Sequence, residues 1–174
     1  MKRFFLTVLA FLLLISPCFG AGAYFKVTGD VFVRNSATGS LDQRVLTLTF
    51  LDDDTSVAMP TLTINSTGWT DGTNTGTFAY VVTGWCGDSV YIDANHAGTE
   101  PTENSDLYIK MWSVDLLGGT GVDQVDNTAE RDCYFLNNGL PKPAPFADSW
   151  VVTITNNAVL SATGTIRIIL FPCK

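Results

Sequence analysis

The sequence is poor in charged side chains. Only 16% of its 174 residues are charged, and ten basic residues stand against seventeen acidic ones, for a net charge of −7. A negative chain lacks the electrostatic attraction on which nucleic-acid binding and attachment to anionic membranes depend, so we expect neither kind of partner. With 46% apolar residues the chain is nevertheless hydrophobic enough to fold, and its length suits one domain.

Catalytic motifs are also missing. The sequence has one histidine, His96, which excludes zinc sites built from several imidazoles, and it has no Gly-x-Ser-x-Gly motif. The carboxylate pairs of glycosidases leave no signature in a sequence, so composition does not exclude them. We therefore expect a protein that is not an enzyme and that needs no cofactor, with calcium as the one plausible metal.

The N-terminus has the pattern of a secretory signal peptide. Lys2 and Arg3 precede an apolar run over residues 4–15, and small residues follow with cleavage positions after Gly20 or Ala23, of which the second is favoured. A helix of that run spans about 18 Å, less than the roughly 30 Å core of a membrane. We predict a signal peptide over residues 1–23 and a secreted protein, extracellular or periplasmic, with no stable membrane span after cleavage.

The rest of the chain alternates apolar and polar residues with a period of two, which is typical of half-buried strands. Turn residues separate the runs, as in Asp71–Gly76, and no helical period is found. We predict an all-β fold over residues 24–174: a single antiparallel β-sandwich, immunoglobulin-like or of a related Greek-key type. Its eight expected strands lie near residues 24–34, 45–50, 61–64, 78–82, 90–92, 107–111, 150–154 and 166–170.

One short stretch resembles a known hairpin. Thr70-Asp71-Gly72, followed by the run from Gly76 to Tyr80, is similar to the hairpin of prealbumin-like and carboxypeptidase-regulatory-like modules. The resemblance implies a sandwich fold and no functional residue.

Residues 115–148 break the regular spacing of strands. The segment is rich in Gly, Asp and Asn, holds the run Pro141–Pro145, and has only Cys133–Leu136 with the character of a strand. It is either an ordinary loop with short strands in it or an interaction loop, in which the extended proline run would dock a partner.

Three cysteines remain if Cys18 leaves with the signal peptide: Cys86, Cys133 and Cys173. In an oxidising compartment this odd number forms one disulfide and leaves one thiol. Pairing of Cys133 with either Cys86 or Cys173 is favoured, and the sequence does not choose between them. The remaining thiol is either buried and inert or bridges to another chain, for which Cys173 near the C-terminus is the candidate.

Aspartates and tryptophans supply the candidate ligand-binding residues. Asp52, Asp53 and Asp54, and the group Asp123, Asp126 and Asp132, are either calcium ligands or solvated turn acids, and neither group matches an EF-hand loop. Exposed tryptophans form platforms for sugar rings, whereas buried ones fill the core. The candidates for a platform are Trp69, Trp85 and Trp112, and the alternation with Met111 favours Trp112 as the exposed one.

Two functions fit these observations. The first is a structural or adhesive protein of the cell surface, such as a subunit of an extracellular filament or surface assembly. Such a protein would associate with itself or with other surface proteins by repeated contacts between strand edges. The alternative is a carbohydrate-binding module with an aromatic platform and a calcium site.

Overall fold

The computed structural model describes residues 22–34, 41–52, 59–93, 99, 101, 105–125, 130–137, 139–159 and 161–173. Most of the predicted signal peptide lies outside the described residues, as do His96, Asp53, Asp54 and Asp126. The predictions made for these residues therefore stay predictions.

The described chain is all-β, as predicted, and every paired strand is antiparallel to its neighbour. No helix in the described residues is long and apolar enough to cross a membrane. The strands in chain order are β1 (Tyr24–Arg34), β2 (Leu41–Leu51), β3 (Leu62–Ile64), β4 (Gly68–Thr70), β5 (Thr75–Thr77), β6 (Trp85–Asp93), β7 (Asp106–Met111), β8 (Val114–Asp115), β9 (Arg131–Tyr134), β10 (Leu136–Asn137), β11 (Leu140–Pro141), β12 (Ala144–Pro145), β13 (Trp150–Thr155) and β14 (Thr163–Pro172).

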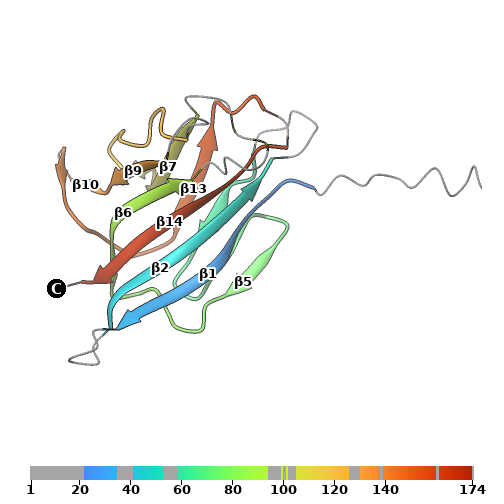
Figure 1. Cartoon of the computed structure of the whole chain (residues 1–174). Helices are drawn as coiled ribbons and strands as arrows, with labels where there is room; N and C mark the ends of the chain where they lie inside the picture. The colour runs from blue at the N-terminus through green and yellow to red at the C-terminus, as the bar shows by residue number, and fades with distance from the viewer. Residues whose placement is uncertain are drawn as a thin grey trace, which may run out of the picture.

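Two six-stranded sheets pack against each other in a β-sandwich-like arrangement (Figure 1). The first sheet has the order β1-β2-β14-β6, and β9 and β12 both pair with the outer edge of β6. The second has the order β5-β4-β3-β13-β7-β8. The start of β1 lies near the β4–β5 turn, where the backbone N–H of Phe25 donates to Asp71.

The core follows from the alternation along the strands. Leu46, Leu48 and Phe50 of β2 are fully buried, as are Ile166 and Ile168 of β14 in the neighbouring position. Each such side chain contributes about 1.5–3 kcal/mol relative to remaining exposed. The intervening residues of both strands form the outer face of the first sheet, which is the face turned away from the core.

The strand expected at residues 78–82 is not formed, so that prediction is wrong. The backbone instead crosses from the second sheet to the first, and the N–H groups of Phe78 and Val82 donate to Thr67 and Ser66. The carbonyls of Tyr80 and Val81 accept from the Arg44 side chain rather than from a neighbouring strand. Phe78 and Val82 of this loop still pack on the core. The sequence here therefore alternates apolar and polar residues as a strand does, although the segment pairs with no neighbouring strand.

The segment 115–148 is partly strand. β9 and β12 extend the first sheet beyond β6, and the β10–β11 hairpin projects between them. The expected strand character of Cys133–Leu136 is confirmed in part, because β9 covers Cys133 and Tyr134.

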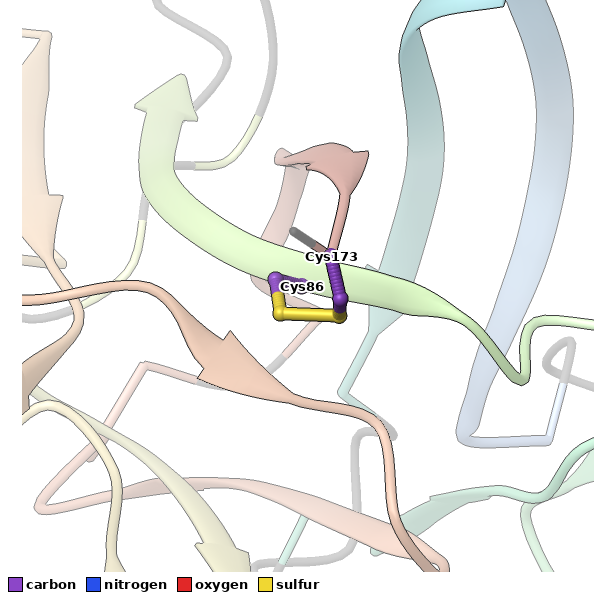
Figure 2. The surroundings of a disulfide bond; sticks show 2 residues. All are labelled: Cys86 and Cys173. Atoms are coloured by element: carbon purple, nitrogen blue, oxygen red, sulfur yellow. A yellow bond between two sulfur atoms is a disulfide. The ribbon is translucent and has the colours of Figure 1, made fainter.

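The disulfide joins Cys86 of β6 to Cys173, just after β14 (Figure 2). Phe171 is opposite Cys86 in the β6–β14 ladder, which brings the Cα atoms of the two cysteines to 5.2 Å. Both favoured pairings of Cys133 are therefore wrong, and Cys173 is not left over to bridge to another chain. Cys133 is the free thiol, and it is buried in the core. A buried thiol was one of the two alternatives given for the cysteine that remains.

Candidate functional site

A fully buried arginine organises the end of the sandwich next to β1. Arg44 donates from Nε and Nη2 to the two carboxylate oxygens of Asp30, each at 2.8 Å. Its other bonds, also 2.8 Å, go to the carbonyls of Tyr80 and Val81. The guanidinium also faces the ring of Phe32, with 4.8 Å to the ring centroid. Every partner is part of the fold, so Arg44 fixes β1 to the loop between β5 and β6.

The other side of β1 has no strand beside it. Within the described residues, β1 pairs only with β2. The N–H of Phe25 points away from β2, because it donates to Asp71 at 3.1 Å. Burial raises the pKa of Asp71, but hydrogen bonds from Asn74, Phe25 and Thr73 outweigh it and hold the pKa below its ordinary value. The ionised carboxylate therefore caps the first part of this edge.

Four exposed apolar side chains surround the second half of β1, and we call them the edge cluster: Val31, Val33, Tyr80 and Val81. Val31 and Val33 lie on the outer face of the first sheet and are 57% and 44% exposed. Tyr80 lies on the core side of β1, with its ring centroid 5.3 Å from that of Phe32. Apolar side chains therefore border the free edge on both sides.

A groove of about 580 Å³ opens at the opposite edge of the molecule, within the range of small-ligand pockets. It lies between the β7–β8 hairpin and the segment from β10 to β12. We call it the Trp112 groove because Trp112 follows the lining residue Met111 in the sequence, although Trp112 itself does not line it. The groove is mainly apolar, and its lining includes Met111, Val114, Leu116, Leu136, Pro143 and Pro145. The predicted proline run thus forms one wall, with Lys142 beside it.

Trp112 stands at the tip of the β7–β8 hairpin and is 69% exposed, as its alternation with Met111 predicted. Trp112 and Ser113 have φ angles of 50° and 69°, the left-handed conformation of a type I′ turn. Glycine and asparagine suit these positions, whereas a bulky side chain there is strained. The indole N–H donates to the Asp148 carboxylate, which fixes the ring and ties the hairpin to the segment after β12.

The other tryptophans do not join Trp112 in a platform. Trp85, one of the three platform candidates, is buried in the core, which is the alternative given for the tryptophans above. Trp69 is half-buried and packs against Gly76, where a Cβ atom would collide with the indole nitrogen. The groove therefore has one exposed tryptophan beside it.

The acidic candidates are hydrogen-bonded within the fold. Asp52 is buried and accepts from the Asn157 side chain at 2.6 Å. Asp123 is exposed, and its backbone N–H donates to the buried Asp106 carboxylate at 2.9 Å. In the part of the chain that the structure describes, no three His, Cys, Asp or Glu side chains are grouped to hold a metal ion.

Of the described groups with a shifted pKa, Tyr91 and Cys133 have the largest shifts. A hydrogen bond with Glu130 is the main reason that the pKa of Tyr91 rises to about 12. Burial, with smaller effects from Asp132 and Asp115, raises the pKa of the Cys133 thiol to about 12. A general acid or base works best with a pKa near the working pH, and a nucleophilic thiol needs a lowered pKa. These two shifts are opposite to what catalysis requires.

No protein-family model matches the chain, and neither do the curated proteins or the solved structures with which it was compared.

Proposed function

We propose that the protein is a non-enzymatic structural or adhesive subunit of an extracellular filament or surface assembly. We assign its sandwich to the immunoglobulin-like or a related Greek-key type. The subunit associates with itself or with other surface proteins through the free edge of β1. The observation that carries this proposal is an eleven-residue edge strand bordered by the exposed edge cluster. Proteins that remain monomeric usually protect such an edge with short strands, prolines, charges or bulges. β1 has Lys26 and a bulge at Thr28 in its first half, but it is long, has no proline, and carries the exposed Val31 and Val33 in its second half.

The compartment is inferred from the signal-like N-terminus and the disulfide. Disulfides persist in oxidising compartments and are rare in the cytosol. The Cys86–Cys173 bond therefore supports secretion, together with residues 1–23. Because this bond lies within one chain, we expect the assembly to be held by noncovalent contacts and to resist reductant.

The test is size-exclusion chromatography with light scattering on the secreted protein over a range of concentrations. We expect a mass above that of the monomer, and a return to the monomer in Val33→Lys, which places a charge beside the free edge. Val122→Lys is the matched control, because Val122 is 40% exposed and lies outside β1. A wild-type protein that stays monomeric at every concentration would show the proposal to be wrong.

The exposed indole of Trp112 favours a second candidate function, which is carbohydrate binding. A fixed aromatic ring beside an apolar groove provides a stacking surface for a sugar ring, and Lys142 and Asn137 supply polar groups. Within the described residues no three acidic side chains are grouped to hold calcium, and Asp53, Asp54 and Asp126 lie outside those residues.

Retention on immobilised polysaccharides tests the second function. We expect Trp112→Ala to abolish retention and Tyr134→Ala to preserve it, since Tyr134 is an exposed aromatic residue on β9 and not on the β7–β8 hairpin. Equal retention of the two variants would exclude Trp112 as the platform. Loss of retention in EDTA would reveal a calcium requirement.

A further inference from the structure

We propose that two copies of the chain pair through β1 in an antiparallel, two-fold symmetric register centred on Phe32. Residues 30–34 of one copy then form a ladder with residues 34–30 of the other, and the two first sheets become one continuous sheet. This inference rests on the proposed self-association and specifies its partner, which is a second copy, and its geometry.

The backbone groups available for this ladder follow from the pairing with β2. The Phe25 N–H points to the free edge, and successive residues of a strand alternate in direction. Val27 pairs with Leu48 and Gly29 with Thr47, so Thr28 is an extra residue that shifts the alternation by one. The N–H and C=O groups of Asp30 and Phe32 therefore face outward. Among the described residues, no backbone hydrogen bond outside the strand ladders uses them, and β1 pairs with no strand other than β2.

The side chains select among the registers that these groups permit. Centring the pair on Phe32 places Val31 opposite Val33 of the second copy twice, once on each side of the axis. Both valines are exposed on the outer face of the sheet in the single chain. Cross-strand pairs of β-branched residues each contribute about 0.2–1 kcal/mol, in addition to the ladder. A two-fold interface requires a self-complementary patch, and these two positions provide one.

Charge supports the same register. Centred on Phe32, the pair places Asp30 opposite Arg34 of the second copy and so avoids a pair of like charges, while the Asp30 carboxylate stays bound to Arg44 of its own chain. Centring on Asp30 would place Lys26 opposite Arg34, two like charges, and Val31 opposite Gly29. Centring on Val31 would place Arg34 opposite the irregular Thr28 and leave Val33 facing Gly29.

Pairing of this kind stops at two copies, because each copy uses the free edge of its β1 and has no second such edge to offer a third copy. The Trp112 groove is at the other edge of both sheets, where β8 and β12 lie. The dimer therefore carries one groove at each end.

Disulfide trapping tests the register. In an antiparallel sheet, opposite residues without mutual backbone bonds have Cα atoms about 4.5 Å apart, which suits a disulfide. We make Val31→Cys and Val33→Cys as separate variants of the full secreted chain and oxidise each alone and the two as a mixture. We expect a reductant-sensitive dimer in the mixture and none in either variant alone, with residues 31 and 33 identified in the linked peptides by mass spectrometry.

Each outcome decides a separate point. The wild-type chain is the control for its own cysteines, because Cys86 and Cys173 are bonded and Cys133 is buried. A linked dimer of Val31→Cys alone would overturn the register in favour of one centred on Val31. If light scattering shows dimers but the mixture does not link, edge pairing is wrong and self-association survives. A monomer by light scattering would overturn both.

Discussion

At the scale of single residues, Arg44 shows how an ionised group is accommodated in the interior. A buried charge is tolerated when its bonds are satisfied, and Arg44 has both oxygens of Asp30 and two backbone carbonyls. In the sequence, Arg44 comes just before the alternating apolar residues of β2, and the predicted strand did not include it. The side-chain direction of Arg44 was therefore not predicted. A charged residue on the inward positions of a strand is the signal that would have identified it.

Removal of Arg44 should cost more than removal of any exposed cation. In Arg44→Met, the Asp30 carboxylate and the carbonyls of Tyr80 and Val81 lose their partner in the interior. We expect a loss of about 3–5 kcal/mol in the free energy of unfolding, measured by urea denaturation. Arg167→Met is the control, because the exposed Arg167 lies over the Tyr91 ring and should contribute less than about 1 kcal/mol. Similar losses in both variants would contradict a structural role specific to Arg44.

The buried Cys133 thiol should make stability depend on alkaline pH. Its pKa is about 12 in the folded chain, against an ordinary value of 9.0. Between these values the unfolded chain releases the thiol proton and the folded chain keeps it, so the free energy of unfolding falls as pH rises from about 9 toward 12. Cys133→Ala should flatten this decline between pH 9 and 11 in denaturation curves. An unchanged slope would show that other groups, such as Tyr91, cause the decline.

At the scale of elements, the long amphipathic strands were predictable and the short ones were not. β2, β7, β13 and β14 carry several inward apolar residues in alternation, which is enough to predict a strand. β8, β10, β11 and β12 have two residues each, too few for any period, and they exist because neighbouring strands offer partners. The disulfide depends on the register of β6 against β14, and this register cannot be derived from the spacing of the cysteines in the sequence.

The disulfide should stabilise the pairing of β6 with β14. It joins residues that are 87 positions apart, and closing a loop of that length in the unfolded chain corresponds to about 4–5 kcal/mol by the chain-entropy relation. The double variant Cys86→Ala/Cys173→Ala should lose about 2–5 kcal/mol in urea denaturation. Reductant should destabilise the wild type to the same degree and leave the double variant unchanged. A reductant effect on the double variant would point to a different bond.

At the scale of the whole molecule, the two candidate surfaces lie at opposite edges of the sheets. The edge cluster borders β1, and the Trp112 groove lies by β8 and β12. Sequence reasoning identified Trp112 and the proline wall of the groove, because both depend on local pattern. It did not find the edge cluster, since the exposure of Val31, Val33 and Tyr80 depends on which strand is left at the edge. Dimerisation through β1 would present two grooves, so binding to a repeating ligand gains from avidity.

The net charge of the chain determines how its dimer should respond to salt. With a charge of −7, and a more negative one once Lys2 and Arg3 are removed with the signal, two copies repel each other. The proposed interface is held mainly by backbone bonds and valine pairs, which salt does not weaken, whereas salt screens the repulsion. We therefore expect sedimentation equilibrium to show tighter dimers in high salt than in low salt. Val33→Lys should remain monomeric in both. Dissociation of the wild-type dimer by salt would mean that ion pairs, rather than the valines, hold the two copies together.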